Sequence, residues 1–257
     1  PAGAGGTLSA GGPLTPAPGS APAVDPVQPA AVATPAPAST VVTGEAAERD
    51  ITVETTSVRA VFTNRGARLR HWVLKRYLDD AGQPLDLVPS ADSVNNALTP
   101  FSLRMDDPAQ TSRVNGALFH STAPASLDAT SAPVTLSFEW HDADGLRVTK
   151  AFTLQPDGYV VSVAVTAQQG TQALNPAIDW GPGLGDDIAH AAQGSFLAPS
   201  YSTPAQALVH QDNSVTRLGA TPGTQDGAFL YAGIDDHYFA ALVLNDGEPP
   251  APMRFDH

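Results

Sequence analysis

The residues of this chain that could do chemistry are spread thinly along the sequence. Its seven histidines, potential metal ligands and general bases, are His71, His120, His141, His190, His210, His237 and His257. No two of them lie two or four residues apart, the spacings that place two ligands on one face of a strand or a helix. The chain also has no cysteine, which excludes disulfides and thiolate metal sites. We therefore predict no metal site and expect surface or half-buried histidines.

Paired aspartates stand in predicted loops and could in principle bind calcium. They are Asp186-Asp187, Asp235-Asp236 and Asp142-Ala-Asp144 followed by Gly145. None of them is part of a twelve-residue calcium loop, which needs further oxygen ligands and a terminal glutamate. We expect the first two pairs to be solvated turn acids and assign the third to a hairpin turn.

The glycine-rich segment 181–185 superficially resembles a phosphate-binding fingerprint. Pro182 lacks the backbone N–H that such a loop needs, and no helix with a downstream acid follows. The sequence also lacks the Gly-x-Ser-x-Gly motif of a nucleophile elbow. We expect a structural turn here, predict no catalytic residue and no cofactor, and interpret the chain as a non-enzyme.

A sugar-active alternative rests on Glu139 and on the aromatic residues. Mutarotase-type chemistry needs a general acid and base, usually glutamate and histidine, facing one sugar pocket. Glu139 follows the strand alternation and should point away from the core, opposite to Trp140. Aromatic side chains that could line a carbohydrate groove or build the core are Trp72, Trp140, Trp180, Phe101, Phe152, Tyr159 and Tyr238. The core is favoured for Trp140 and Phe152, while Trp180 beside its turn is evenly balanced.

The element that positions Glu139 is a predicted β-hairpin. Residues 134–140 and 146–154 both alternate apolar and polar side chains, with Lys150 at one inward position of the second run. Asp-Gly at 144–145 is a strong hairpin signal, because glycine tolerates the positive φ of the turn. Such a half-buried hairpin must pack its apolar face against another layer.

The rest of the chain repeats this pattern. Further strands are predicted at 51–55, 57–63, 67–77, 85–88, 101–105, 117–121, 159–166, 177–180, 207–210, 214–218, 227–233 and 237–244. Residues 67–77 would also suit a short helix, residues 186–199 could hold one helical turn, and residues 159–166 are apolar enough for a central strand. Many short strands without a long amphipathic helix predict an all-β sandwich with at most one or two short helices.

Composition divides the chain and excludes some partners. Residues 1–48 are rich in alanine and proline and predict a disordered tether, whereas residues 49–257 are the size of one β domain. The net charge of −13 argues against nucleic-acid and anionic-lipid surfaces. No apolar run approaches the ~20 residues that span a bilayer.

Several segments, taken in order, resemble the large periplasmic domain of YidC-type membrane protein insertases of Gram-negative bacteria. They are residues 51–55 with Asn64-Arg-Gly66, residues 74–77 with 82–89, Lys150-Ala-Phe-Thr-Leu154 with 158–161, Asp179-Trp-Gly-Pro-Gly-Leu-Gly185, and residues 233–240. Each segment is weakly specific alone, but their shared order is fairly specific. The alanine- and proline-rich segment before Ile51 also resembles the family's tether.

The resemblance implies a β-super-sandwich like that of sugar mutarotases and other carbohydrate-binding domains. It implies a periplasmic location in an inner-membrane protein that inserts and folds membrane proteins, with the Sec translocon, its accessory subunits and nascent membrane proteins as partners. The family's insertion chemistry lies in a transmembrane groove that this segment does not contain, so no functional residue is transferred and the binding surface stays unassigned. The family's domain continues into further strands and a helix, so residues 49–257 are expected to lack their C-terminal end.

Overall fold

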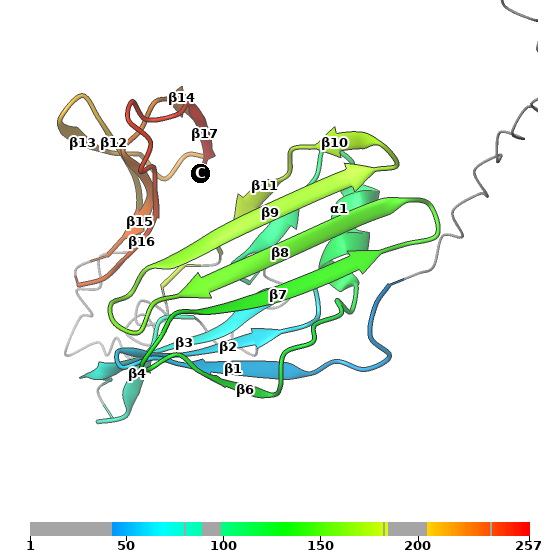
Figure 1. Ribbon diagram of the computed structural model, residues 1–257. Coiled ribbons are helices and arrows are strands. Elements are labelled where there is room, and N and C mark those ends of the chain that lie inside the picture. Colours follow the sequence, from blue (N-terminus) through cyan, green and yellow to red (C-terminus); the bar gives the residue numbers. More distant parts are fainter. Residues whose placement is uncertain (1–42, 80, 89–98, 182, 185–204, 237) are drawn as a thin grey trace, which may run out of the picture. The chain divides into compact units, whose positions relative to one another are not determined.

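A computed structural model describes residues 43–79, 81–88, 99–181, 183–184, 205–236 and 238–257 (Figure 1). Most of the predicted tether, 1–48, lies outside these ranges, as does the predicted helical turn within 186–199. The division of the chain at residue 48 therefore stays a prediction.

Two β-sheets form the body of the molecule, and their strands are joined mostly by antiparallel pairing (Figure 1). The first sheet contains, in spatial order, β4 (Pro84–Asp86), β3 (Arg68–Leu78), β2 (Val58–Thr63), β1 (Asp50–Glu54) and β6 (Ser126–Asp128). The second contains β10 (Gln172–Leu174), β9 (Val161–Gln169), β8 (Leu146–Leu154) and β7 (Val134–His141). β1 and β6 are parallel neighbours.

The inward side chains of both sheets share one apolar core, as the alternation predicts. Phe62 on β2 meets Phe152 on β8 with ring centroids 4.7 Å apart. This contact between the layers confirms the predicted all-β sandwich.

The hairpin of β7 and β8 has the predicted register. Leu136 pairs with Phe152 and Trp140 with Val148, and all four side chains are buried. The turn is closed by a hydrogen bond from the Gly145 N–H to the Asp142 carbonyl at 3.3 Å, and Gly145 has a φ of +85°. The expected positive φ of this glycine is confirmed.

Other predicted segments had mixed outcomes. Residues 67–77, predicted as a strand although their spacing would also suit a short helix, are the strand β3, which pairs with β2 and β4. Residues 117–121 are not a strand but form only isolated bridges, Leu118 with Arg65 and His120 with Glu139. β9 lies between β8 and β10 as expected, but β10 pairs with it only from Ala167 to Gln169.

One helix, α1 (Pro108–Gly116), was not predicted. Asp107 caps it by accepting the Ala109 N–H at 2.8 Å, and Pro108 takes the first position, where no N–H is needed. The Asn115 side chain then bonds the Leu103 backbone N–H and carbonyl at 2.9 and 2.7 Å, which fixes α1 against β5 (Ser102–Arg104). β5 pairs in turn with β11 (Ala177–Asp179).

The C-terminal residues form two further antiparallel sheets with a small core of their own. Their strands are β12 (Gln206–Gln211), β13 (Ser214–Arg217), β14 (Thr224–Gly227), β15 (Tyr231–Asp235), β16 (Ala240–Leu244) and β17 (Met253–Asp256). The predicted strand at 227–233 is thus divided between β14 and β15. Across the ranges that the structure describes, no helix is long and apolar enough to cross a membrane.

Candidate functional site

The histidines of the described ranges do not converge on one point. His71 Nδ1 lies 2.6 Å from Asp86 Oδ2, and His120 Nδ1 lies 3.9 Å from Glu45 Oε1. His210 stacks on Tyr231 with centroids 4.8 Å apart. His257 stacks on Phe255 and His141 faces outward on β7, while His190 and His237 fall outside the described residues. No cluster of three potential metal ligands occurs within the described ranges.

The aspartates at the hairpin turn are held by an arginine. Arg113 on α1 donates from one Nη1 atom to Asp142 Oδ2 at 2.9 Å and to Asp144 Oδ2 at 2.6 Å. The other oxygen of Asp142 accepts the Leu146 N–H at 2.9 Å. These contacts confirm that this pair belongs to the hairpin turn.

The other aspartate pairs fall differently. Asp235 is paired with Arg217, and Asp236 Oδ1 caps a turn by accepting the N–H groups of Tyr238 and Phe239 at 2.7 and 2.6 Å. Asp235 and Asp236 thus serve a turn, although their side chains are mostly covered and not freely solvated. Asp186 and Asp187 lie outside the described residues, as do Pro182 and Gly185 of the glycine-rich turn.

The aromatic side chains divide between core and surface. Trp72, Trp140, Phe101 and Phe152 are buried, as favoured for Trp140 and Phe152. Trp180 is 36% exposed and meets Phe101 edge-on, with ring centroids 5.8 Å apart. It therefore covers the core edge and keeps part of its ring in solvent.

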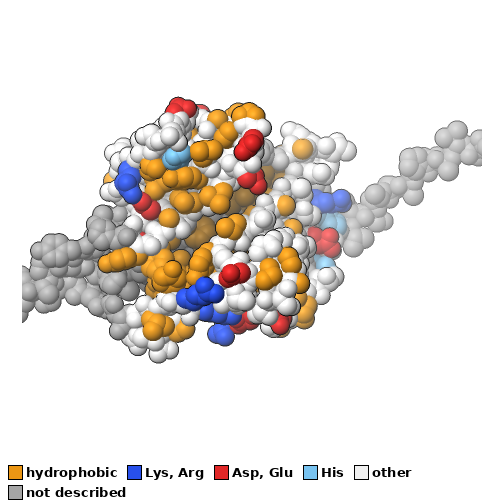
Figure 2. All heavy atoms as spheres, turned by 60° about the vertical axis from the view of Figure 1, so that its left-hand side comes forward, with side chains coloured by type: hydrophobic (Ala, Val, Ile, Leu, Met, Phe, Trp, Pro, Cys, Tyr) orange, Lys and Arg blue, Asp and Glu red, His pale blue; other side chains and the backbone are white. Residues whose placement is uncertain are grey.

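Exposed apolar side chains gather at the ends of β3 and β9, and we call this group the aromatic surface. Tyr77 meets Tyr159 and Phe239 edge-on, at centroid distances of 6.3 and 5.5 Å. Leu78 and Val160 beside them are more than half exposed. Figure 2, in which the left-hand side of Figure 1 comes forward, shows apolar side chains gathered around a hollow. Contiguous exposed apolar surface is typical of interaction sites.

Lys150 fills the middle one of the inward positions of β8 and is almost fully buried. Its ammonium group donates to the carbonyl oxygens of Gly66 at 2.7 Å, Ala67 at 3.2 Å and Phe101 at 2.7 Å. All three acceptor residues have positive φ angles, of +68°, +48° and +68°. Burial, and then the charge of Arg68, lowers the pKa of Lys150 well below its ordinary value, while the three carbonyl dipoles favour the charged form. Lys150 thus holds two left-handed turns against β8.

The segments that carry the family resemblance meet around this lysine. Gly66 ends the Asn64-Arg-Gly66 turn, and a Cβ atom on it would lie 2.7 Å from the Asn115 carbonyl oxygen. The Phe101 N–H donates to the Asp179 carbonyl at 3.0 Å, which brings in the segment that begins there. The shared residues therefore build the fold at this point.

A partly buried polar clamp, made of Glu45, Arg49 and Asn64, fixes the start of the described chain. The Asn64 amide donates to Glu45 Oε2 at 3.0 Å, and its oxygen accepts the Arg49 N–H at 2.9 Å. Arg49 bonds both oxygens of Glu45 and the carbonyls of Ser121 and Ala123. The hydrogen bond from Arg49 leads the causes that lower the pKa of Glu45.

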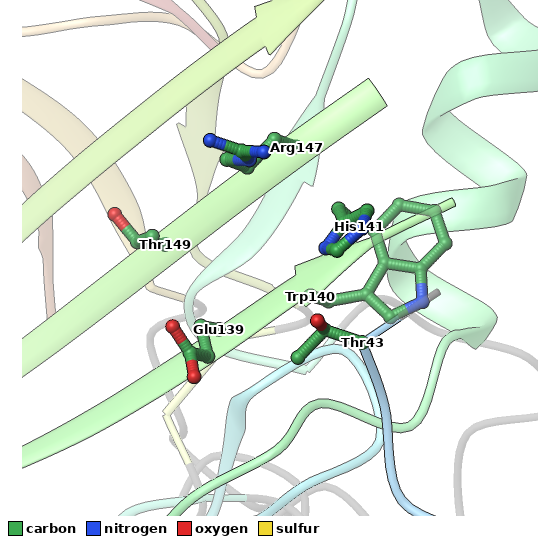
Figure 3. Close-up of a pocket in the computed structure, with 6 residues that line it drawn as sticks. All are labelled: Thr43, Glu139, Trp140, His141, Arg147 and Thr149. Carbon is green, nitrogen blue, oxygen red and sulfur yellow. The ribbon is translucent and has the colours of Figure 1, made fainter. Parts of the chain in front are cut away.

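Glu139 points outward, as predicted, into a shallow hollow of about 250 Å³ on the outer face of β7 and β8 (Figure 3). The residues that line the hollow are Thr43, Glu139, Trp140, His141, Arg147 and Thr149. Glu139 and His141 share this face two residues apart, which separates their backbones by about 7 Å. The pair has the residue types of the sugar-active alternative, but Trp140 is only 9% exposed and offers little flat surface to a sugar ring. Sequence reasoning found Glu139 and missed Arg147, although both follow from the hairpin register.

The fold is that of an all-β sandwich domain. Its polar residues Lys150 and Arg113 bond to turns of the chain. The chain matches the family model described as the YidC periplasmic domain over residues 50–257, and it belongs to that family.

Three relatives named as membrane protein insertase YidC show the extent of the similarity. The one from Geobacter metallireducens is 28% identical over 238 residues, which cover 89% of this chain and 42% of the relative. The one from Syntrophus aciditrophicus is 28% identical over 216 residues, 79% of this chain and 37% of the relative. The one from Endomicrobium trichonymphae is 25% identical over 215 residues, 82% and 34% respectively. The chain thus spans less than half the length of each of them.

Proposed function

We propose that this chain is a non-catalytic periplasmic domain of a membrane protein insertase, and that it assists the insertion and folding of inner-membrane proteins by binding Sec components or the substrate. The observation that carries the proposal is the family match over residues 50–257. The matching relatives are longer than this chain, and their name describes them as membrane protein insertases.

Two structural features support a binding role. The residues that the family resemblance rests on are engaged in structural contacts, such as those of Lys150 with Gly66 and Phe101. The aromatic surface, in contrast, leaves Tyr77, Leu78 and Val160 exposed, and an apolar segment of a nascent membrane protein could cover them.

Crosslinking tests the proposal directly. A photoreactive amino acid at Tyr77 or Val160, in the full-length protein in its own membrane, should crosslink to Sec components or to a nascent membrane protein. The matched control position is Ser126, exposed on β6 at the edge of the first sheet away from β3, where no crosslink is expected.

Deletion of the domain gives the second test. Removal of residues 50–257 from the full-length protein should reduce association with Sec components or the yield of inserted substrate. Unchanged association and unchanged insertion, with the variant present at the normal level, would count against the proposal.

A further inference from the structure

The hollow on β7 and β8 carries an inference beyond the proposed function. Glu139 pairs with Thr149 and His141 pairs with Arg147 across the two strands, so all four side chains lie on one outward face. The backbone of Thr43 bonds that of His141 in both directions at 3.1 Å, which closes one side of the hollow. The charged groups are therefore presented on a hydrogen-bonded frame (Figure 3).

Arg147 differs from every other basic residue of the chain. All 13 lysines and arginines fall within the described ranges, and each except Arg147 forms an ion pair with a carboxylate or donates to a backbone carbonyl. Within those ranges Arg147 has no such partner, although the chain has 26 acidic residues. Glu139, diagonally across the hollow, also has no ion-pair or side-chain hydrogen-bond partner among the described residues. Both charges are thus available to a ligand.

We propose that Arg147 and His141 form a carboxylate-binding site for an extended segment of a partner polypeptide. A guanidinium donates two parallel hydrogen bonds to a carboxylate, and the imidazole beside it can add a third. Glu139 accepts a backbone N–H of the same segment. It also repels a dianion, because a second negative charge would lie near its own carboxylate, so a singly charged carboxylate fits better than a phosphate.

The surroundings of the hollow fit an extended polypeptide. The next row of outward residues across the three strands is Ser137, Ala151 and Ala164, as the register of β7, β8 and β9 shows. Because these side chains are small, the sheet surface beside Glu139 and Thr149 has room for the backbone of an extended segment. The carboxylate can come from an acidic side chain or from a free C-terminus, since both present the same group.

An NMR titration of the whole chain tests the site. The probes are a blocked peptide of glycine and threonine with one central glutamate, the same peptide with glutamine, and the glutamine peptide with a free C-terminal carboxylate. The two carboxylate peptides should shift the backbone amide signals of Glu139, His141 and Arg147, and the stronger of them identifies the natural source. The blocked glutamine peptide should bind at least about fivefold more weakly.

Variants assign the effect to the hollow. Arg147→Gln should weaken binding of the carboxylate peptides about tenfold. Arg59→Gln is the matched control, because Arg59 is similarly exposed on a strand but paired with Glu54, and binding should not change. Glu139→Gln should strengthen the binding of inorganic phosphate by removing the repelling charge. Amide signal dispersion confirms that each variant is folded.

The contrary results are equally specific. Equal binding of the glutamate and glutamine peptides, unchanged binding by Arg147→Gln, or tighter binding of phosphate than of peptide to the unmodified chain would overturn the site. Shifts of the same amides by galactose and not by peptides would replace it with the sugar-binding alternative. The site is independent of the proposed function, since peptide binding in solution and Sec crosslinking in membranes can each fail alone.

Discussion

The ammonium nitrogen of Lys150 lies 2.7 Å from the carbonyl oxygen of Phe101, in the interior of the sandwich. Phe101 has a φ of +68°, a conformation that costs roughly 1–2 kcal/mol for a residue with a side chain. A charged lysine in an apolar core is also costly without partners. The strained turn directs the Phe101 carbonyl at the Lys150 ammonium group. This hydrogen bond therefore offsets both the strain at Phe101 and the burial of the lysine.

Lys150→Met tests this relationship. The methionine side chain is about as long as the lysine stem and is apolar like that stem, but it has no hydrogen-bond donor. The carbonyls of Gly66, Ala67 and Phe101 would therefore lose their common partner. Each buried acceptor left unsatisfied costs about 1–3 kcal/mol, partly offset because the desolvated charge is gone. We expect a net loss of about 2–4 kcal/mol in the free energy of unfolding, measured by urea denaturation.

The matched control for that variant is Lys75→Met. Lys75 is partly exposed and paired with Glu54, so the loss should stay below about 1 kcal/mol. If the two substitutions cost the same, the three carbonyls do not depend on Lys150.

A second prediction concerns Ala67, a buried alanine with a φ of +48°. Ala67→Gly loses one methyl group, about 0.8 kcal/mol, but relieves a left-handed strain of about 1–2 kcal/mol. The free energy of unfolding should therefore change little or rise. Ala60→Gly is the comparison, since Ala60 is equally buried in β2 and gains no such relief, and it should lose about 1.5 kcal/mol. Equal losses at both positions would show that Ala67 is not strained.

A third prediction concerns calcium at the hairpin turn. Arg113 already pairs with Asp142 and Asp144, so calcium must displace a guanidinium and cannot find the further oxygen ligands it prefers. Added calcium should leave the Tm of the chain unchanged in calorimetry, while Arg113→Gln should lower stability by up to about 1 kcal/mol. A calcium-dependent rise in Tm that Asp142→Asn abolishes would contradict this assignment.

The sequence predicts well those elements whose signals are local. The hairpin of β7 and β8 follows from strict alternation and an Asp-Gly turn, and even the inward position of Lys150 can be read from its place in that alternation. The helix α1 also has a local signal, Asp107 before Pro108, but its weakly apolar face hides it. Ambiguity between helix and strand at β3 ends only when β2 and β4 supply pairing partners.

What the sequence does not predict depends on contacts between distant residues. Lys150 and Gly66 are 84 positions apart, and no local pattern shows which acceptors the lysine will find. The hollow is intermediate, because the hairpin register places Glu139 and Arg147 on one face. Whether Arg147 lacks an acidic partner, however, depends on the whole fold. A candidate site that is recognised because a charged residue lacks a partner is therefore the hardest kind to predict from the sequence.

The last prediction concerns Asp256 on β17, whose carboxylate accepts three donors. Thr224 Oγ1 lies at 2.7 Å, Arg104 Nη2 at 2.9 Å and Arg254 Nε at 3.2 Å. The hydrogen bond from Thr224, followed by that from Arg104, lowers the pKa of Asp256 from 3.8 to about 2. The unfolded chain therefore binds a proton at a higher pH than the folded one. The stabilising contribution is complete above pH 3.8 and is lost as the pH falls through about 2.

Asp256→Asn isolates this contribution from that of the other acids. The difference in the free energy of unfolding between the unmodified chain and the variant should be largest above pH 3.8 and should shrink towards pH 2. Thr224→Val removes the leading donor, so as a single substitution it should reduce this pH dependence of the stability. In the double variant, which also carries Asp256→Asn, it should not change the pH dependence further. Urea denaturation across the acid range measures all four chains. A difference independent of pH would mean that Asp256 acts through shape and neutral hydrogen bonding, because only a shifted proton equilibrium makes the stability depend on pH.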